Sequence, residues 1–163
     1  MDGLDPVAEA IRQWRAHDLG AQAHMEAVAN VNRLSQLVVA RIEATLREFD
    51  MTFPQYEALL LLDFAQDGAL PLGRMGRRLT VHPTTVTNTV DHLERKGLVE
   101  REHTPDDRRR VLARITKEGR KRSTAASKAL AEIRFGLEGM KIGEAREISG
   151  AIAHYREAMG DRV

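Results

Sequence analysis

The chain has no cysteine, few aromatic residues and no long apolar run, and each absence removes a class of protein. Without cysteine there is no disulfide, no thiolate metal site and no cysteine-based redox sensor. The longest apolar run, Ala58 to Leu62, is far too short to cross a bilayer, and the N-terminus lacks a signal-peptide pattern. We therefore expect a cytoplasmic protein with no membrane partner.

The composition favours one helical folding unit. The 163 residues include 42% apolar and 30% charged side chains, with only 12 glycines and 5 prolines. This length allows a sizeable core but hardly two independent domains. Because aromatic residues make up only 4%, the core is expected to be aliphatic.

The net charge of +1 hides an uneven distribution. Residues 74–122 hold 14 Lys/Arg and 7 Asp/Glu, leaving 11 and 17 for the rest of the chain, so the net charges are +7 and −6. A basic middle between acidic ends is typical of a segment that binds nucleic acid. A solvated basic face explains the same numbers equally well.

Hydrophobic spacing predicts helices over both ends of the chain. We expect a short amphipathic helix at 6–17 ended by Gly20, a long helix over 21–49, and two more helices over about 120–136 and 143–158. Between them, Thr52 and Gln55 have the spacing of a capping box that opens an almost wholly apolar helix through Ala65. Residues 67–71 are predicted to form a turn.

Two helices with a tight connection are predicted next, in a helix-turn-helix pattern. The first covers 72–79 with three arginines outward, and the second opens at Pro83 and stops at Gly97. Val86, Val90 and Leu93 lie on one face of the second helix. Two β-rich runs then flank "TPDDRR", which predicts a hairpin or wing.

Short polar side chains in the first half of the second helix suit a helix that reads bases in a DNA major groove. Asn88 can bond adenine through paired hydrogen bonds, and threonines can touch thymine methyls or phosphates. A solvated, threonine-capped helix start is the simpler alternative. The candidate base-reading residues are Thr84, Thr85, Thr87 and Asn88, with His82 just before them as a phosphate contact or a turn former.

Two groups of arginines would supply the sequence-independent part of DNA binding by neutralising phosphates or entering a narrow minor groove. Asp107, two residues before Arg109, is expected to orient that guanidinium rather than to touch DNA. The candidate arginines are Arg74, Arg77 and Arg78 beside the first helix and Arg108, Arg109 and Arg110 on the wing.

The run "LGRMGRRLTVHPTTVTNTVDHLERKGLVEREHTPDDRRRVLARITKEG" resembles the multiple-antibiotic-resistance regulator (MarR) family, including its Asp-x-Arg wing signature. The resemblance covers residues 21–160. It implies a single domain over 1–163, mainly α-helical with a small β-hairpin wing. That domain comprises a winged helix-turn-helix DNA-binding lobe (54–116) and a helical dimerisation region (6–50 and 117–160). It also implies a homodimer on a pseudo-palindromic DNA operator, often released by a small aromatic or anionic effector.

The N-terminal helix is similar to an extension found in the urate-type subgroup of that family. The subgroup's ligand-binding positions correspond to Trp14, Glu57 and His92. The last two depart from the pattern, which has aspartate and arginine there. Arg95, one turn further on, is an alternative cation. A lone tryptophan on the apolar side of an amphipathic helix is also a common packing residue.

Two other classes of protein are alternatives to a ligand-responsive regulator. A helical dimeric adaptor could bind an acidic protein partner through the basic segment. An enzyme is not expected, because the sequence has no catalytic triad order, no HExxH motif, no phosphate-binding glycine loop and no carboxylate pair that a helix would place in an apolar pocket. The histidines lack metal-binding spacing, so neither a metal nor another cofactor is expected.

Overall fold

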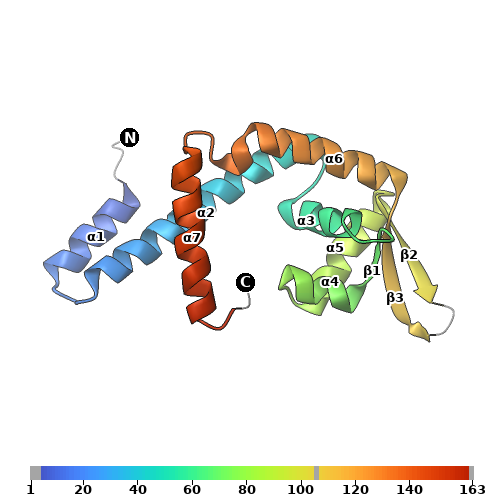
Figure 1. Cartoon of the computed structure of the whole chain (residues 1–163), viewed down its shortest axis with the longest axis horizontal. Helices are drawn as coiled ribbons and strands as arrows, with labels where there is room; N and C mark the ends of the chain where they lie inside the picture. Colours follow the sequence, from blue (N-terminus) through green and yellow to red (C-terminus); the bar gives the residue numbers. More distant parts are fainter. Residues whose placement is uncertain (1–4, 105–106, 162–163) are drawn as a thin grey trace.

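The computed structural model describes residues 5–104 and 107–161, with side chains described for all of these except residues 103, 104 and 107–110. The molecule is elongated, with a lobe of small elements at one end and long helices extending from it (Figure 1). The described elements are α1 (Pro6–Ala16), α2 (Gln22–Leu46), η1 (Arg47–Phe49), α3 (Phe53–Asp63), β1 (Ala69–Pro71), α4 (Leu72–Leu79), α5 (Pro83–Arg95), β2 (Val99–Thr104), β3 (Asp107–Ile115), α6 (Lys117–Glu132), η2 (Arg134–Gly136) and α7 (Ile142–Ala158).

The corner between α2 and α3 is built from local signals in the sequence. Asp50 turns the chain in the left-handed backbone region at φ 51°. The hydroxyl of Thr52 then accepts a hydrogen bond from the Gln55 N–H, and the Gln55 side chain accepts one from the Thr52 N–H. The predicted capping box is therefore confirmed, and it sets the direction in which α3 enters the core.

The sheet contains a strand that the sequence did not predict. Strand order is β1-β3-β2, and both pairings are antiparallel. The stretch expected to be only a turn ends in β1, where Leu70 lies opposite Ala113 of β3. Three residues ending in proline carry no strand periodicity, so this strand depends on the edge that β3 offers. The hairpin itself is confirmed, although its strands extend further than expected, to Thr104 and from Asp107.

Helix α6 begins three residues before the predicted start, because Gly119 is not a breaker here. The Thr116 hydroxyl accepts a hydrogen bond from the Gly119 N–H at 3.0 Å and caps the helix. A Cβ on Gly119 would lie 2.2 Å from the Leu98 carbonyl oxygen, a distance that real Cβ atoms essentially never show. Because glycine has no Cβ, the start of α6 can lie in close contact with the backbone at Leu98, directly before β2.

The buried core lies in the lobe and in the parts of α2 and α6 that cover it. Its fully buried members include Leu46, Leu59, Met75, Leu93 and Leu130, from five helices. As expected, the core is almost wholly aliphatic. This core holds α4, α5 and the sheet in fixed relative positions.

The other ends of the long helices are different. Neither α1 nor α7 buries a single residue, and α2 buries only Ile42 and Leu46, both in its last two turns. Figure 1 shows α7 crossing α2 and α1 folded back beside the start of α2. None of the described helices has the length and apolar character needed to span a membrane.

Candidate nucleic-acid interface

Helix α4 separates an apolar face from a basic one. Met75 is fully buried, whereas the three predicted arginines are exposed. No ion pair joins them to another described residue, so nothing in that part of the chain neutralises their charge. These arginines are Arg74, Arg77 and Arg78.

Residues 80–82 connect α4 to α5, and the second helix is capped by a side chain. His82 is the N-cap: its ring nitrogen Nδ1 accepts a hydrogen bond from the Thr84 N–H at 3.3 Å and lies 3.1 Å from the Thr84 hydroxyl. Pro83 occupies the first helical position, where a missing N–H costs nothing. His82 therefore forms the turn, one of the two roles expected for it, and it stays exposed at the helix start.

The exposed face of α5 carries the predicted base-reading side chains. Val86, Val90 and Leu93 are buried on the opposite face, at 2% exposure or less. The Thr87 hydroxyl donates to the Pro83 carbonyl at 3.2 Å, which leaves its methyl group and oxygen lone pairs outward. The exposed polar residues are Thr84, Thr85, Thr87 and Asn88.

The wing follows directly from the C-terminal end of α5. The backbones of Asp107 to Arg110 belong to β3, which pairs with β2 along the hairpin. The predicted contacts of Arg108, Arg109 and Arg110, and the orientation of Arg109 by Asp107, fall on side chains outside the described set.

A lysine that sequence reasoning missed anchors the other end of α5. The ammonium of Lys96 contacts the carbonyl oxygen of Asp50, lies 3.2 Å from the Asp50 carboxylate, and donates to the Gln55 side chain at 3.4 Å. These partners belong to the corner between α2 and α3. The end of the candidate reading helix is thereby tied to the end of the long helix, a link that 46 residues of separation hide from local patterns.

Trp14 lies in the last turn of α1, just before the connection to α2. Its indole N–H donates to the Gly20 carbonyl oxygen at 2.7 Å, and the side chain is only partly buried. Gly20 has φ 72°, which favours glycine, so the bond closes the turn around the residue that breaks the helix. Trp14 therefore has a structural role within its own chain, and its ligand role stays a prediction.

Glu57 and His92 lie in the lobe, on α3 and α5, two helices that pack together. Protein atoms around the Glu57 carboxyl exclude part of its water, and this desolvation raises its pKa above the ordinary glutamate value. The guanidinium of Arg95 contacts Nδ1 of the His92 ring, which places a permanent cation beside the imidazole. Within one chain, Trp14 is separated from both residues by α2, whose 25 residues span roughly 37 Å at ~1.5 Å per residue.

The described residues contain no group of three or more His, Asp or Glu side chains placed to hold a metal ion. Two short helices joined by three residues, with a hairpin behind the second, place this lobe in the winged helix-turn-helix class of DNA-binding proteins.

Similarity to known proteins identifies the family within the winged helix-turn-helix class. The profile of the MarR family matches residues 51–111. Sco5413, a MarR family transcriptional regulator from Streptomyces coelicolor, has 39% identity and a TM-score of 0.80, covering 87% of this chain and 98% of its own. The HTH-type transcriptional regulator YhbI of Bacillus subtilis is 30% identical over 125 residues, or 74% of this chain and 80% of its own. The fold also matches the S. aureus MepR–DNA complex, with 23% identity, a TM-score of 0.71, and coverage of 78% of this chain and 94% of that one.

The chain therefore belongs to the MarR family. It is a DNA-binding transcriptional regulator and not an enzyme.

Proposed function

We propose that the protein is a homodimeric repressor that binds a pseudo-palindromic operator and is released by a small aromatic or anionic effector. The observation that supports the DNA contact most directly is the division of α5 into a buried apolar face and an exposed threonine and asparagine face. The exposed arginines of α4 flank that face. The wing residues Arg108, Arg109 and Arg110 complete the proposed surface on sequence grounds alone.

The DNA contact is tested with a duplex that the wild-type chain enriches from a randomised library, called the selected duplex below. Asn88→Ala is expected to relax base preference at one position per half-site by about 1–3 kcal/mol while general DNA affinity is kept. Arg109→Ala is expected to weaken binding to all sequences and to lower the salt slope by about 0.9 for each copy of the chain on the duplex. Unchanged base preference in the first variant contradicts the assignment of α5, and unchanged affinity in the second contradicts that of the wing.

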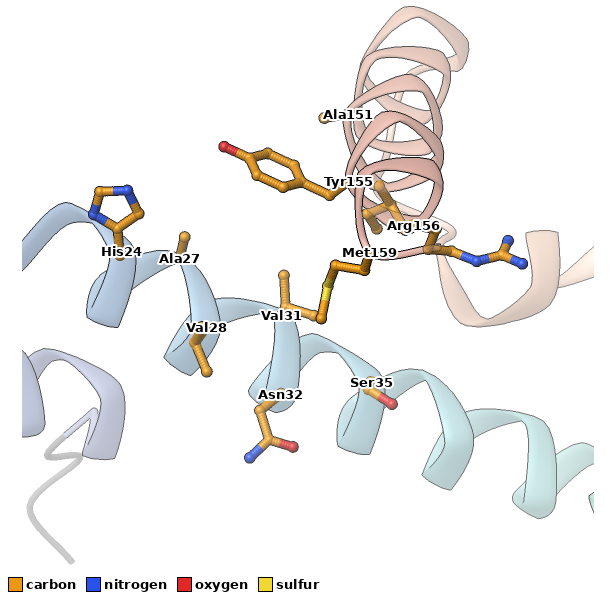
Figure 2. Close-up of a pocket in the computed structure, with 11 residues that line it drawn as sticks. His24, Ala27, Val28, Val31, Asn32, Ser35, Ala151, Tyr155, Arg156 and Met159 are labelled. Carbon is orange, nitrogen blue, oxygen red and sulfur yellow. The ribbon is translucent and has the colours of Figure 1, made fainter. Parts of the chain in front are cut away.

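The dimer is supported by an apolar groove of about 750 Å³ between α2 and α7. Figure 2 shows Tyr155 of α7 and Met159, directly after this helix, extending over α2 toward His24 and Val31. Met159 is 85% exposed and Tyr155 65%. Neighbouring large apolar side chains that are this exposed are typical of a surface that binds a partner. A second copy of the same helices would cover them, and residues 6–50 and 117–160 would form the dimerisation region.

Ile152→Glu, in the wall of this groove, tests the dimer. Burying an unpaired carboxylate should raise the dimer dissociation constant by roughly a hundredfold or more, as measured by sedimentation. Ile152→Leu is the matched control and should leave assembly nearly unchanged. A dimer of wild-type strength in the glutamate variant would show that the groove lies outside the interface.

The effector site is proposed to consist of Trp14, Glu57 and His92, as in the urate-type subgroup. Since α2 separates Trp14 from the other two in one chain, the site would combine Trp14 of one copy with the lobe of the other. An anionic ligand there would meet the Arg95 and His92 pair and would change the spacing of the two α5 helices, which must lie about 34 Å apart to meet both half-sites.

Thermal unfolding with urate, salicylate and small dicarboxylic acids tests the effector, because a compound that binds only the folded dimer raises its apparent stability. An effector should quench the fluorescence of Trp14, the only tryptophan, and should dissociate the selected duplex. The Trp14→Phe variant controls for the spectroscopic signal, since it keeps an aromatic ring but loses the indole N–H. Compounds that release the duplex without quenching Trp14 would place the effector site elsewhere.

A further inference from the structure

One arginine of the wing, Arg101, contacts the side of α5, the candidate base-reading helix. Arg101, in β2, directs its guanidinium at three residues of α5. It donates to the Glu94 carboxylate at 3.2 Å and to the Thr87 carbonyl at 3.4 Å, and it forms an ion pair with Asp91. Its side chain is only 26% exposed. Residues 87, 91 and 94 are spaced one helical turn apart, so a single planar group spans two turns of α5.

The two carboxylates that Arg101 contacts carry negative charge, which is unfavourable on a helix that enters a DNA groove. Asp91 and Glu94 are the only acidic residues of α5. Uncompensated, they would repel the phosphates on either side of the groove. In the described part of the chain, Arg101 is the cation that reaches both carboxylates. Arg95 donates to the Asp91 backbone carbonyl and contacts the His92 ring, and Lys96 bonds the corner between α2 and α3.

The same contact joins two parts of the DNA-binding surface. Arg101 pairs in register with Ala113 of β3, so it is fixed within the sheet that carries the wing. Ion pairs from this position to α5 limit the angle between the wing and the helix. The forked guanidinium suits this bridge, because a lysine ammonium is a single point charge and lacks the planar fork.

We infer that Arg101 is a positioning residue for DNA binding, which neutralises Asp91 and Glu94 and fixes the wing relative to α5. This inference rests on the proposed interface. The guanidinium of Arg101 is ion-paired within the protein. The guanidinium groups of Arg74, Arg77 and Arg78 are exposed and have no ion pairs to described residues. The Arg101 guanidinium is turned to the protein, and theirs face the solvent side on which DNA would lie.

A mutant cycle on the selected duplex tests the inference. Arg101→Met should weaken binding roughly tenfold, since coupled neighbours of this kind interact by about 0.5–3 kcal/mol and each 1.4 kcal/mol is tenfold. The pair Asp91→Asn with Glu94→Gln should bind nearly as the wild type does. Combining all three substitutions should return affinity to within about threefold of that pair, because the charges that Arg101 neutralised are gone and only its effect on the wing angle is lost.

Arg114→Met is the matched control. Arg114 is also a strand arginine paired with a carboxylate, but its partners are Glu102 of β2 and the Asp67 carbonyl, not α5. Its loss should lower the melting temperature without changing the affinity of the folded protein. All affinities are compared at a temperature at which circular dichroism shows each variant folded, so a purely structural effect leaves the dissociation constant unchanged.

The outcomes distinguish a failure of the Arg101 inference from a failure of the proposed DNA interface. If the triple variant binds as weakly as Arg101→Met, Arg101 contacts DNA directly and the inference is wrong. Wild-type affinity in Arg101→Met, in a protein whose Asn88→Ala variant has lost base preference, also overturns it and leaves the interface intact. An Asn88→Ala variant with unchanged base preference overturns the interface and the inference together. Should Arg101→Met fail to fold, Arg101→Lys replaces it, with a loss of roughly threefold expected and the same rescue required.

Discussion

The lobe and the terminal helices of this chain are built from similar aliphatic residues but use them differently. In the lobe, Leu59, Leu62 and Leu93 are fully buried. On α2, Val28 is 69% exposed and Leu37 52%, although both follow helical hydrophobic spacing. The difference shows that the lobe obtains its packing partners from its own chain. The terminal helices have apolar surface that their own chain does not cover, which is what a region reserved for a second copy should look like.

Two leucine truncations test this difference between the lobe and the terminal helices, and the one in the lobe has the largest expected effect. Leu93→Ala leaves a cavity in the lobe and should lower the free energy of unfolding by about 2–5 kcal/mol, as measured by urea denaturation. Leu37→Ala removes a half-exposed side chain and should cost the fold less. In the proposed dimer it should raise the dissociation constant roughly tenfold, because the contact is lost in both copies. Equal effects of the two truncations on unfolding, with no effect of Leu37→Ala on assembly, would remove the distinction between the regions.

The same comparison explains which features the sequence could predict. The Thr52 and Gln55 capping box and the apolar face of α5 depend on residues three or four apart, and both predictions are confirmed. Family resemblance extended this to the whole winged helix-turn-helix fold. Strand β1 was missed because only the edge of β3 makes three residues a strand.

The anchors of α5 were missed for a related reason. Arg101 and Lys96 belong to a charged, basic stretch in which any side chain could face solvent. Their partners lie 7 to 46 residues away, so their roles depend on packing between elements rather than on local spacing. The proposed DNA and effector residues stay predictions, because they would meet partners outside the chain, and neither local spacing nor packing within one chain bears on such contacts.

A pair of glycine substitutions gives the next largest effect. Gly119→Ala places a Cβ 2.2 Å from the Leu98 carbonyl, and backbone cannot yield as a flexible side chain can. We expect a loss of about 1–3 kcal/mol in the free energy of unfolding. Gly73→Ala in α4 is the matched control: its Cβ meets nothing within 4 Å, so better helix propensity should stabilise the lobe by up to about 1 kcal/mol. A neutral Gly119→Ala would mean that α6 can shift away from the sheet, and the lobe would then be less rigid than its packing indicates.

The smallest expected effect concerns the ion pair within the wing. The hydrogen bonds from the Arg114 guanidinium to the Glu102 carboxylate lower the pKa of that carboxyl. A lowered pKa in the folded state means that the pair stabilises the lobe above the unfolded glutamate pKa of about 4.3, and that this contribution is lost as the pH falls through the folded value. Glu102→Gln should therefore lower the melting temperature slightly at pH 7, and the difference from the wild type should vanish once the pH has fallen below the lowered pKa of Glu102 in the folded state. Glu48→Gln, on the exposed surface of η1 and without an ion pair among the described residues, is the matched control and should melt close to the wild type. A gap between Glu102→Gln and the wild type that persists at low pH would mean that the glutamate contributes through packing, and the wing would then resemble the lobe core more than a charged surface.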